Sequence, residues 1–225
     1  MTKKRTTRDK AERVKTAKGR KTSSTQWLKR QLNDPYVAKA QMEGYRGRAA
    51  YKLIELNEKL DILKPNLMVV DLGAAPGGWT QVAAQKGCKV VGLDILPMDP
   101  IEGAMLIEMD FMDDDAPDRL RAAMAEMNEG SEMADLVISD MAPNTIGHRN
   151  TDHLRIMALV ELAYHFAKEV LKPEGTFIAK VRQGGTENDL LAQMKQDFKT
   201  TKHIKPPASR KESAETYLIA QGFRG

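Results

Sequence analysis

Cysteine pairs, long apolar runs and metal-ligand clusters are all missing from this chain of 225 residues. Cys88 is the single cysteine, so no internal disulfide can form and a reducing compartment is expected. No apolar run approaches the roughly 18 residues that a membrane helix needs, and the basic N-terminus is not followed by an apolar signal core. His148, His153, His165 and His203 lack metal-ligand spacing. We therefore expect a cytoplasmic protein without a membrane span or a bound metal.

The charge is unevenly distributed along the chain. Residues 1–30 carry twelve lysines and arginines against Asp9 and Glu12, which leaves a net charge of −6 on the remainder. Large apolar residues are almost absent from residues 1–24, a composition typical of disorder. We predict a basic, disordered arm over residues 1–30 and one domain over residues 31–225. A basic arm on an acidic body favours a polyanionic partner, and nucleic acid first.

The most informative stretch is residues 69–80, with the sequence VVDLGAAPGGWT. Its β-branched start predicts a buried strand, and a glycine-rich loop and a helical pattern follow. Such a loop lets a ligand approach the backbone, and the helix start supplies free N–H groups. Ala75 stands where the Gly-x-Gly-x-x-Gly of dinucleotide enzymes has its second glycine. The loop therefore favours a cofactor without a pyrophosphate, namely S-adenosylmethionine, over a nicotinamide.

Expected strands and helices alternate along the rest of the chain. We predict strands over residues 67–72, 89–93, 104–109, 135–139 and 176–181, followed by two closely spaced strands over residues 202–205 and 216–221. We predict helices over residues 46–60, 79–86, 117–130, 152–171 and 187–198, and a short helix or loop over residues 34–45. This order is typical of α/β Rossmann-like class I methyltransferases, with a mostly parallel seven-stranded sheet, an antiparallel last strand and helices on both faces.

Several charged residues are expected at the edge of the sheet where the parallel strands end, which is where ligands bind in such folds. Asp71, Asp94, Asp110, Asp140 and Lys180 lie at strand ends, and Glu215 opens the expected antiparallel strand. Asp94 follows the loop by about twenty residues, as a ribose-binding carboxylate does, and Asp110 could bind an adenine amino group. Lys52 flanks the apolar stripe of the first helix, a pattern that by itself predicts a surface lysine.

The sequence resembles the FtsJ/RrmJ family of ribose 2′-O-methyltransferases over roughly residues 27–223. The resemblance rests on RAAYKL at residues 48–53, VDLGAAPGGW at 70–79, DILPMDP at 94–100, SDMAPN at 139–144, KV at 180–181 and SAETY at 213–217. It implies S-adenosylmethionine as cofactor and a Lys-Asp-Lys-Glu tetrad. The implied catalytic residues are Lys52, Asp140, Lys180 and Glu215, with Lys180 as proton acceptor. The implied cofactor-binding residues are Gly73, Gly77, Trp79, Asp94, Asp110 and Asp140.

The resemblance also implies the reaction and its substrate, which is a uridine in the 23S ribosomal RNA of the large ribosomal subunit. The methyl group moves from the sulfonium to a ribose 2′-hydroxyl by in-line displacement. An ordinary lysine, with a pKa of about 10.4, is protonated at neutral pH. Lys180 therefore either becomes neutral and takes the hydroxyl proton, or stays charged and stabilises the developing alkoxide. We expect phosphate contacts at Arg46, Arg48, Lys205 and Arg210, and a monomer that supports ribosome assembly.

Three other functions remain open from the sequence. The same chemistry could act on transfer RNA or on a messenger RNA cap. The chain could instead be an RNA-binding ribosome assembly factor without catalysis, although the complete tetrad weighs against that interpretation. A nicotinamide-dependent dehydrogenase is the least favoured, because the glycine loop lacks the dinucleotide pattern.

Overall fold

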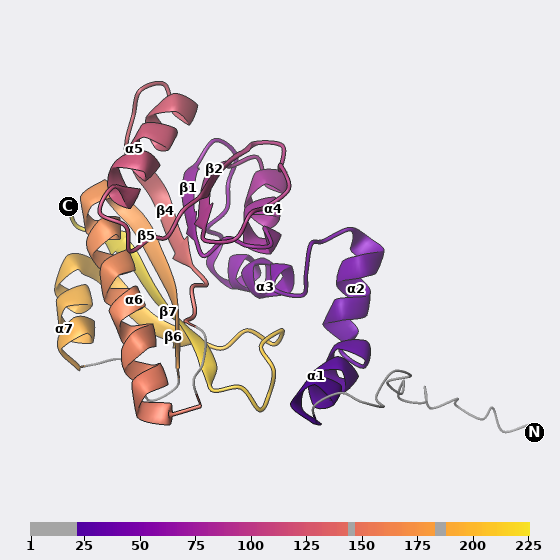
Figure 1. Cartoon of the computed structure of the whole chain (residues 1–225). Coiled ribbons are helices and arrows are strands. Elements are labelled where there is room, and N and C mark those ends of the chain that lie inside the picture. Colours follow the sequence, from indigo (N-terminus) through magenta and orange to yellow (C-terminus); the bar gives the residue numbers. More distant parts are fainter. Residues whose placement is uncertain (1–21, 144–146, 183–187) are drawn as a thin grey trace, which may run out of the picture.

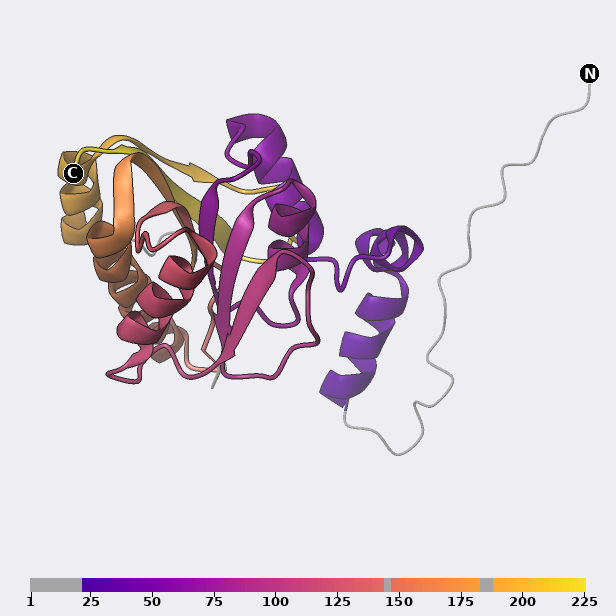
Figure 2. The ribbon, with the colours of Figure 1, turned by 90° about the horizontal axis from the view of Figure 1, so that it is seen from above.

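The computed structural model describes residues 22–143, 147–182 and 188–225. One sheet lies between two layers of helices, and the first two helices project from this body (Figures 1 and 2). Within these three ranges, no helix is both long enough and apolar enough to cross a membrane.

The sheet has seven strands in the order β3-β2-β1-β4-β5-β7-β6. The strands are β1 (Met68–Leu72), β2 (Lys89–Asp94), β3 (Ala104–Glu108), β4 (Ala134–Ser139), β5 (Leu171–Arg182), β6 (Phe198–Ile204) and β7 (Glu215–Phe223). Neighbours from β3 to β5 pair in parallel, whereas β7 pairs antiparallel with both β5 and β6. The start of β7 therefore lies at the edge where the parallel strands end.

Seven helices are seen in the described residues. They are α1 (Thr22–Leu32), α2 (Pro35–Glu43), α3 (Ala50–Leu60), α4 (Gly78–Gln85), α5 (Ala116–Met127), α6 (Arg149–Val170) and α7 (Asn188–Asp197). Helices α5, α6 and α7 cover one face of the sheet, and α3 and α4 cover the other (Figure 1). Strand β1 has apolar side chains on both faces of the sheet: Val70 packs into the core beneath α5, α6 and α7, and Val69 into the core beneath α3 and α4. Apolar side chains on both faces are what a parallel sheet needs when helices cover each of them.

The predicted fold class is confirmed, and most element boundaries shift by only a few residues. Strand β5 begins at Leu171, opposite Ala134, although residues 172–175 were expected only to end the preceding helix. Regular pairing with β4 resumes at Thr176 opposite Leu136, so the intervening residues form an irregularity in the ladder. Strand β6 begins at Phe198, directly after α7, and is longer than expected.

The basic arm is the part that differs most from expectation. Disorder was predicted to residue 30, but Thr22–Leu32 forms α1. The hydroxyl residues at positions 22–25 are typical of a helix start, and Leu28 and Leu32 lie one turn apart on the helix, a local pattern that composition alone obscures. Residues 1–21, which carry most of the arm's charge, lie outside the described residues, as do residues 144–146 and 183–187.

Candidate active site at the carboxyl edge of the sheet

Side-chain alternation along the strands decides which groups share a face of the sheet. Ile138 on β4, Ile178 on β5 and Ile219 on β7 all point into the core beneath α3 and α4. Because successive side chains alternate, counting by twos from these positions reaches the charged edge on the same face. The side chains found there are Asp140, Lys180, Tyr217 and Glu215. Helix α3 packs on this face and contributes Lys52.

The four predicted catalytic residues meet in one cluster. Lys52 Nζ lies 2.5 Å from a Glu215 carboxylate oxygen and 3.9 Å from an Asp140 oxygen. Lys180 Nζ lies 3.1 Å from the other Asp140 oxygen and donates a hydrogen bond to the Asp140 backbone carbonyl. The pattern around Lys52 taken alone favoured a surface lysine, but the residue is only 9% exposed. Its burial follows from the two carboxylates that compensate its charge.

Tyr217 lies at the centre of this cluster, and sequence analysis assigned it no role. Its Oη accepts from Lys52 Nζ at 3.0 Å and lies 2.7 Å from Asp140 and 3.2 Å from Glu215, to one of which it donates its single proton. In the antiparallel ladder Tyr217 is the register partner of Lys180. The signal was present in the sequence, because Tyr217 follows Glu215 by two residues on an expected strand and must share its face.

The charges of the cluster reinforce one another. Burial alone would raise the pKa of Asp140, but the ammonium groups of Lys180 and Lys52 lower it below its usual range. Burial and the neighbouring Asp140 and Glu215 carboxylates raise the pKa of Tyr217 well above its usual range. Tyr217 is therefore a neutral hydrogen-bonding group at physiological pH.

The glycine loop follows β1 beside this cluster. Gly73 has a φ of +78°, and a Cβ there would lie 2.8 Å from the Met141 backbone nitrogen. Gly77 has a φ of +101°, and a Cβ there would lie 2.8 Å from the Ile101 side chain. Both glycines are thus required by the chain's own backbone conformation and packing. Their contact with a cofactor stays a prediction.

Two carboxylates lie along the adjoining edge, as predicted. Asp94 accepts hydrogen bonds from the Ala75 and Leu96 backbone nitrogens, both at 2.9 Å. Asp110 accepts one from the Met112 nitrogen at 3.0 Å. A carboxylate oxygen has two lone pairs, so both side chains retain acceptor capacity. The loop and the ends of β2 and β3 are therefore fixed in a shape that still offers acceptors to a ligand.

The surroundings of these carboxylates fit a nucleoside. Ile95, Leu96 and Met112 are 61%, 58% and 63% exposed, large fractions for apolar side chains. They follow the ends of β2 and β3, next to Asp94 and Asp110. Apolar side chains suit the faces of a planar base, while the carboxylates suit its amino group and the ribose hydroxyls. These carboxylates and apolar side chains therefore fit S-adenosylmethionine, the cofactor that the sequence predicts.

Trp79 connects the two halves of the site. Its indole nitrogen donates to the Ala49 carbonyl at 2.8 Å, just before α3. Its ring centroid lies 5.3 Å from that of Tyr217, and its side chain is almost fully buried. Trp79 thus holds α4, α3 and β7 together, and its predicted part in cofactor binding would come through this position rather than through an exposed ring.

Asp71 is the one buried acid of β1, and it faces α4. Thr80 Oγ1 donates to one of its oxygens at 2.7 Å, whereas the other oxygen has no hydrogen-bond partner among the described residues. Complete burial, together with the nearby Asp140 and Asp94 carboxylates, raises the pKa of Asp71 to about 7. The fold therefore prefers the protonated acid at this position.

This preference predicts how stability depends on pH. A raised carboxyl pKa means that the folded state holds the proton more tightly than the unfolded chain does. The contribution of Asp71 to the free energy of unfolding therefore decreases as the pH rises from about 4 to 7, and it is constant above that range. We expect Asp71→Asn to raise Tm relative to the native chain more at pH 8 than at pH 5. Thermal unfolding at both values measures this. Exposed Asp114→Asn is the control, and an equal effect of Asp71→Asn at both pH values would contradict the prediction.

The predicted phosphate-binding residues are all engaged within the protein. Arg46 donates to the carbonyls of Pro76, Asp99 and Pro100, and so clamps the glycine loop to the segment after β2. Lys205 donates to two carbonyls of the loop that follows β6. Contacts of these two side chains with RNA stay a prediction, but their structural role is plain.

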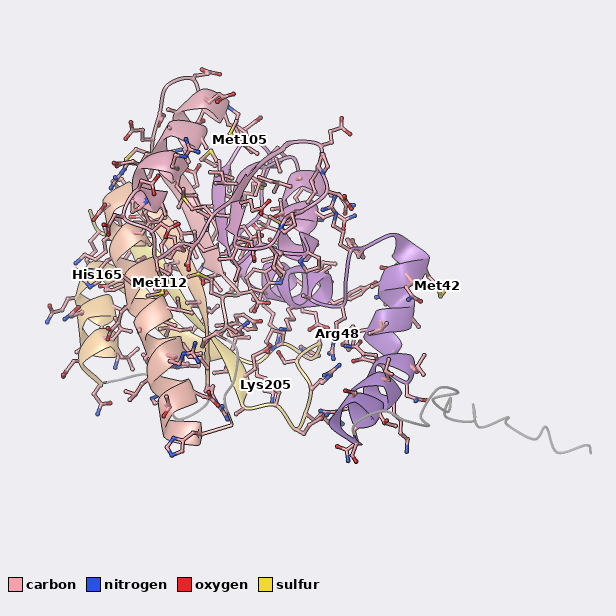
Figure 3. The ribbon with its side chains drawn as sticks, in the orientation of Figure 1. Met42, Arg48, Met105, Met112, His165 and Lys205 are labelled. Atoms are coloured by element: carbon pink, nitrogen blue, oxygen red, sulfur yellow. The ribbon has the colours of Figure 1, made fainter. Side chains whose placement is uncertain are left out.

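Arg48 and Arg210 converge on Asp34. Arg48 pairs with the Asp34 carboxylate, donates to the Ala208 carbonyl and stacks 5.7 Å from the Tyr36 ring centroid. Arg210 lies 3.5 Å from the same Asp34 oxygen. Figure 3 shows Arg48 between the body and the α1–α2 pair, and Lys205 directly after β6, where the neighbouring loop begins. The two arginines therefore join the N-terminal helices to the loop between β6 and β7.

The sheet order, with β7 antiparallel next to β5, and the carboxylates at the ends of β2 and β3 define a Rossmann-like methyltransferase domain. The described residues hold no group of three or more His, Cys, Asp or Glu side chains that could bind a metal. A sequence model of the FtsJ-like methyltransferases matches residues 45–223, so the chain belongs to that family.

Relatives and solved structures agree with this assignment. The chain is 61% identical to "Ribosomal RNA large subunit methyltransferase E" of Paramagnetospirillum magneticum, over 95% of this chain and 88% of the relative. It is 59% identical to the Novosphingobium aromaticivorans protein of the same name, over 95% of both chains. A Plasmodium falciparum crystal structure assigned as a ribosomal RNA methyltransferase shares 33% identity and a TM-score of 0.71, covering 80% of this chain and all of that one.

Proposed function

We propose that this enzyme transfers a methyl group from S-adenosylmethionine to the ribose 2′-hydroxyl of a uridine in 23S ribosomal RNA. The observation that carries the proposal is the cluster of two lysines, two carboxylates and a tyrosine. This cluster lies at the same edge of the sheet as Asp94 and Asp110, whose surroundings fit a nucleoside. Relatives of about 60% identity carry the name of a large-subunit ribosomal RNA methyltransferase. Every residue of the cluster comes from one chain, which supports action as a monomer. The reducing compartment expected for Cys88 supports the cytoplasm, where ribosomes assemble.

Bound S-adenosylmethionine supplies an electrophilic methyl group on a sulfonium. Asp94 and Asp110 would hold its ribose hydroxyls and adenine amino group, and Asp140 would border the methyl group. Lys180, fixed by two contacts to Asp140, would meet the 2′-hydroxyl oxygen. There it would take the hydroxyl proton or stabilise the negative charge that develops on the oxygen. Lys52 and Glu215 would position the ribose, so that much of the rate would come from alignment.

A basic cavity next to the cluster supports an RNA substrate. It has a volume of about 550 Å³ and lies between α1, the start of α2 and the loop between β6 and β7. Five basic side chains line it, against the acidic Asp34 and Glu212. The five are Lys29, Arg30, Arg48, Arg210 and Lys211. We propose that phosphates flanking the target nucleotide bind there, because backbone contacts position RNA while the 2′-hydroxyl distinguishes it from DNA.

Removing two charges from this cavity should weaken RNA binding. Lys29 and Lys211 are exposed and carry no ion pair within the described part of the chain. We expect the double variant Lys29→Gln/Lys211→Gln to lower RNA affinity and to reduce the slope of log affinity against log salt by about 1 to 2. Fluorescence anisotropy across a salt series measures both quantities.

A matched control removes the same charge from the opposite edge of the sheet. Lys64 and Lys86 precede β1 and β2, at the amino ends of the strands. Lys64→Gln/Lys86→Gln should keep the native salt slope. Equal slopes for the two double variants would mean that RNA does not use the cavity.

The proposed function is tested by offering the enzyme labelled S-adenosylmethionine with different RNAs. We expect label in large ribosomal subunits, on a ribose 2′-oxygen of one uridine in 23S RNA. Labelling of transfer RNA or capped RNA instead would move the activity to another substrate. Cofactor binding without transfer to any of these RNAs, combined with tight ribosomal binding, would favour a non-catalytic assembly factor.

A further inference from the structure

The loop between β6 and β7 is held through both backbone polar groups of one residue, Ala208. The Ala208 N–H donates to Glu55 at 2.7 Å, and the Ala208 carbonyl accepts from Arg48. The other Glu55 oxygen accepts from Tyr36 Oη at 2.9 Å. Ala208 is fully buried against Ala40 and Tyr51. Ala208 is therefore fixed against α2 and α3 by hydrogen bonds and by packing.

The next residue connects this anchor to the catalytic cluster. Ser209 is 4% exposed, and its hydroxyl donates to a Glu215 oxygen at 3.3 Å. The same Glu215 oxygen is the one that pairs with Lys52. This oxygen is thus contacted by Lys52 on α3, by Tyr217 on β7 and by Ser209 on the anchored loop.

These contacts close a ring. Lys52 and Glu55 lie one turn apart on α3, so the helix that presents the lysine also holds the loop that orients the lysine's partner. We propose that Glu55 is a positioning residue for methyl transfer, acting through Ala208 and Ser209 on Glu215 and through Glu215 on Lys52. The effect on methyl transfer rests on the proposed function, whereas the effect of Glu55 on the pairing between Glu215 and Lys52 does not depend on it.

Glutamine is the conservative replacement that tests the proposal. Glu55→Gln keeps an oxygen for the Ala208 N–H, whereas Glu55→Ala removes it. We expect Glu55→Ala to lower kcat by about 10- to 100-fold, the scale on which small misplacements act, with S-adenosylmethionine affinity unchanged. Glu55→Gln should retain kcat within about threefold of the native enzyme. A merely structural loss would lower the folded fraction and not kcat per folded enzyme.

Glu58→Ala is the matched control, because Glu58 is an exposed glutamate on the same helix and has no recorded partner in the described structure. It should leave kcat unchanged. Ser209→Ala should lower kcat by the same route as Glu55→Ala, so the double variant should lose less than the product of the two single losses. Native kcat in Glu55→Ala, or independent losses in the double variant, would overturn the proposal.

A readout without activity separates this proposal from the proposed function. The side-chain chemical shifts of Lys52 report its pairing with Glu215. We expect them to move in Glu55→Ala toward their values in Glu215→Gln, and to stay native in Glu58→Ala. If they move while the native enzyme methylates no RNA, the proposed function fails and the positioning role stands. If the native enzyme is active and the shifts stay native in Glu55→Ala, the positioning role fails alone.

Discussion

Lys180→Ala is expected to abolish methyl transfer while S-adenosylmethionine still binds. The Lys180 ammonium is the group of the cluster that Asp140 holds through both its side chain and its backbone. The predicted cofactor contacts at Asp94, which ends β2, and Asp110, two residues beyond β3, lie on the far side of β1 and β4 from Lys180. We expect a fall in kcat of at least about 10³-fold, consistent with the loss of an electrostatic or proton-accepting group. Single-turnover transfer and a cofactor-binding titration measure the two quantities.

Lys180→Arg separates the two roles that the sequence left open. Arginine keeps the positive charge but does not give up its proton in proteins. Substantial activity in Lys180→Arg would show that charge alone suffices, whereas inactivity would favour proton transfer to Lys180. Full activity of Lys180→Ala would remove Lys180 from the mechanism altogether.

Asp140→Asn should have the second-largest effect, because it reaches both halves of the site. Asparagine keeps an acceptor for Tyr217 but removes the charge opposite Lys180 and Lys52. Lys52 keeps its pair with Glu215, but the half-buried Lys180 loses its carboxylate partner, which costs about 3 kcal/mol of folding free energy. We also expect kcat to fall by about 10²-fold or more through misplacement of Lys180. Denaturant unfolding and kinetics on the folded fraction measure the two effects.

The sign of the pH dependence follows from the pKa of Asp140, which is lowered in the folded state. The stabilisation that its charge provides is present above the unfolded pKa of about 4 and is lost as the pH falls through the folded value. The stability gap between native enzyme and Asp140→Asn should therefore be constant from about pH 5 upward and should narrow below about pH 4. A gap that widens in acid would contradict the assigned ion pairs.

The charged residues at this edge of the sheet were predictable, because the alternation of side chains along a strand and the end of a strand can both be recognised from neighbouring residues in the sequence. Asp94, Asp110, Asp140 and Lys180 each follow or end a short apolar run, and parallel strands bring such ends together. Glu215 was placed by the expectation of an antiparallel last strand, which the structure confirms. The position of Tyr217 could have been predicted in the same way, because side chains two residues apart on a strand lie on the same face of the sheet. Once residues 216–221 are assigned to a strand, Tyr217 must lie on the same face as Glu215.

Other features depend on contacts between distant segments, which periodicity does not encode. The helical pattern around Lys52 alone favoured a surface lysine, and only the family resemblance implied a catalytic one, because no neighbouring residue in the sequence indicates the carboxylates that compensate its buried charge. Phosphate binding by Arg48 stays a prediction, but its contacts with Asp34, fourteen residues away, and Ala208, 160 residues away, were not predictable from the residues around it. A basic residue in a sequence reveals its charge and not the partner that satisfies it.

The position of β7 has a consequence for synthesis of the protein on the ribosome. This strand is made after the other six, yet it lies between β5 and β6, and β6 has no other neighbour in the sheet. Until β7 emerges from the ribosome, β5 presents an unpaired edge and β6 has no strand to pair with. Lys52 also lacks its partner Glu215, which lies 163 residues further along the chain. Contacts between segments so far apart in the sequence make folding slow, and the sheet is completed only after β7 has been synthesised. A chain that stops before residue 215 would therefore carry β1, β2 and β3 with the predicted cofactor-binding residues, but would lack Glu215 and Tyr217 of the predicted catalytic cluster.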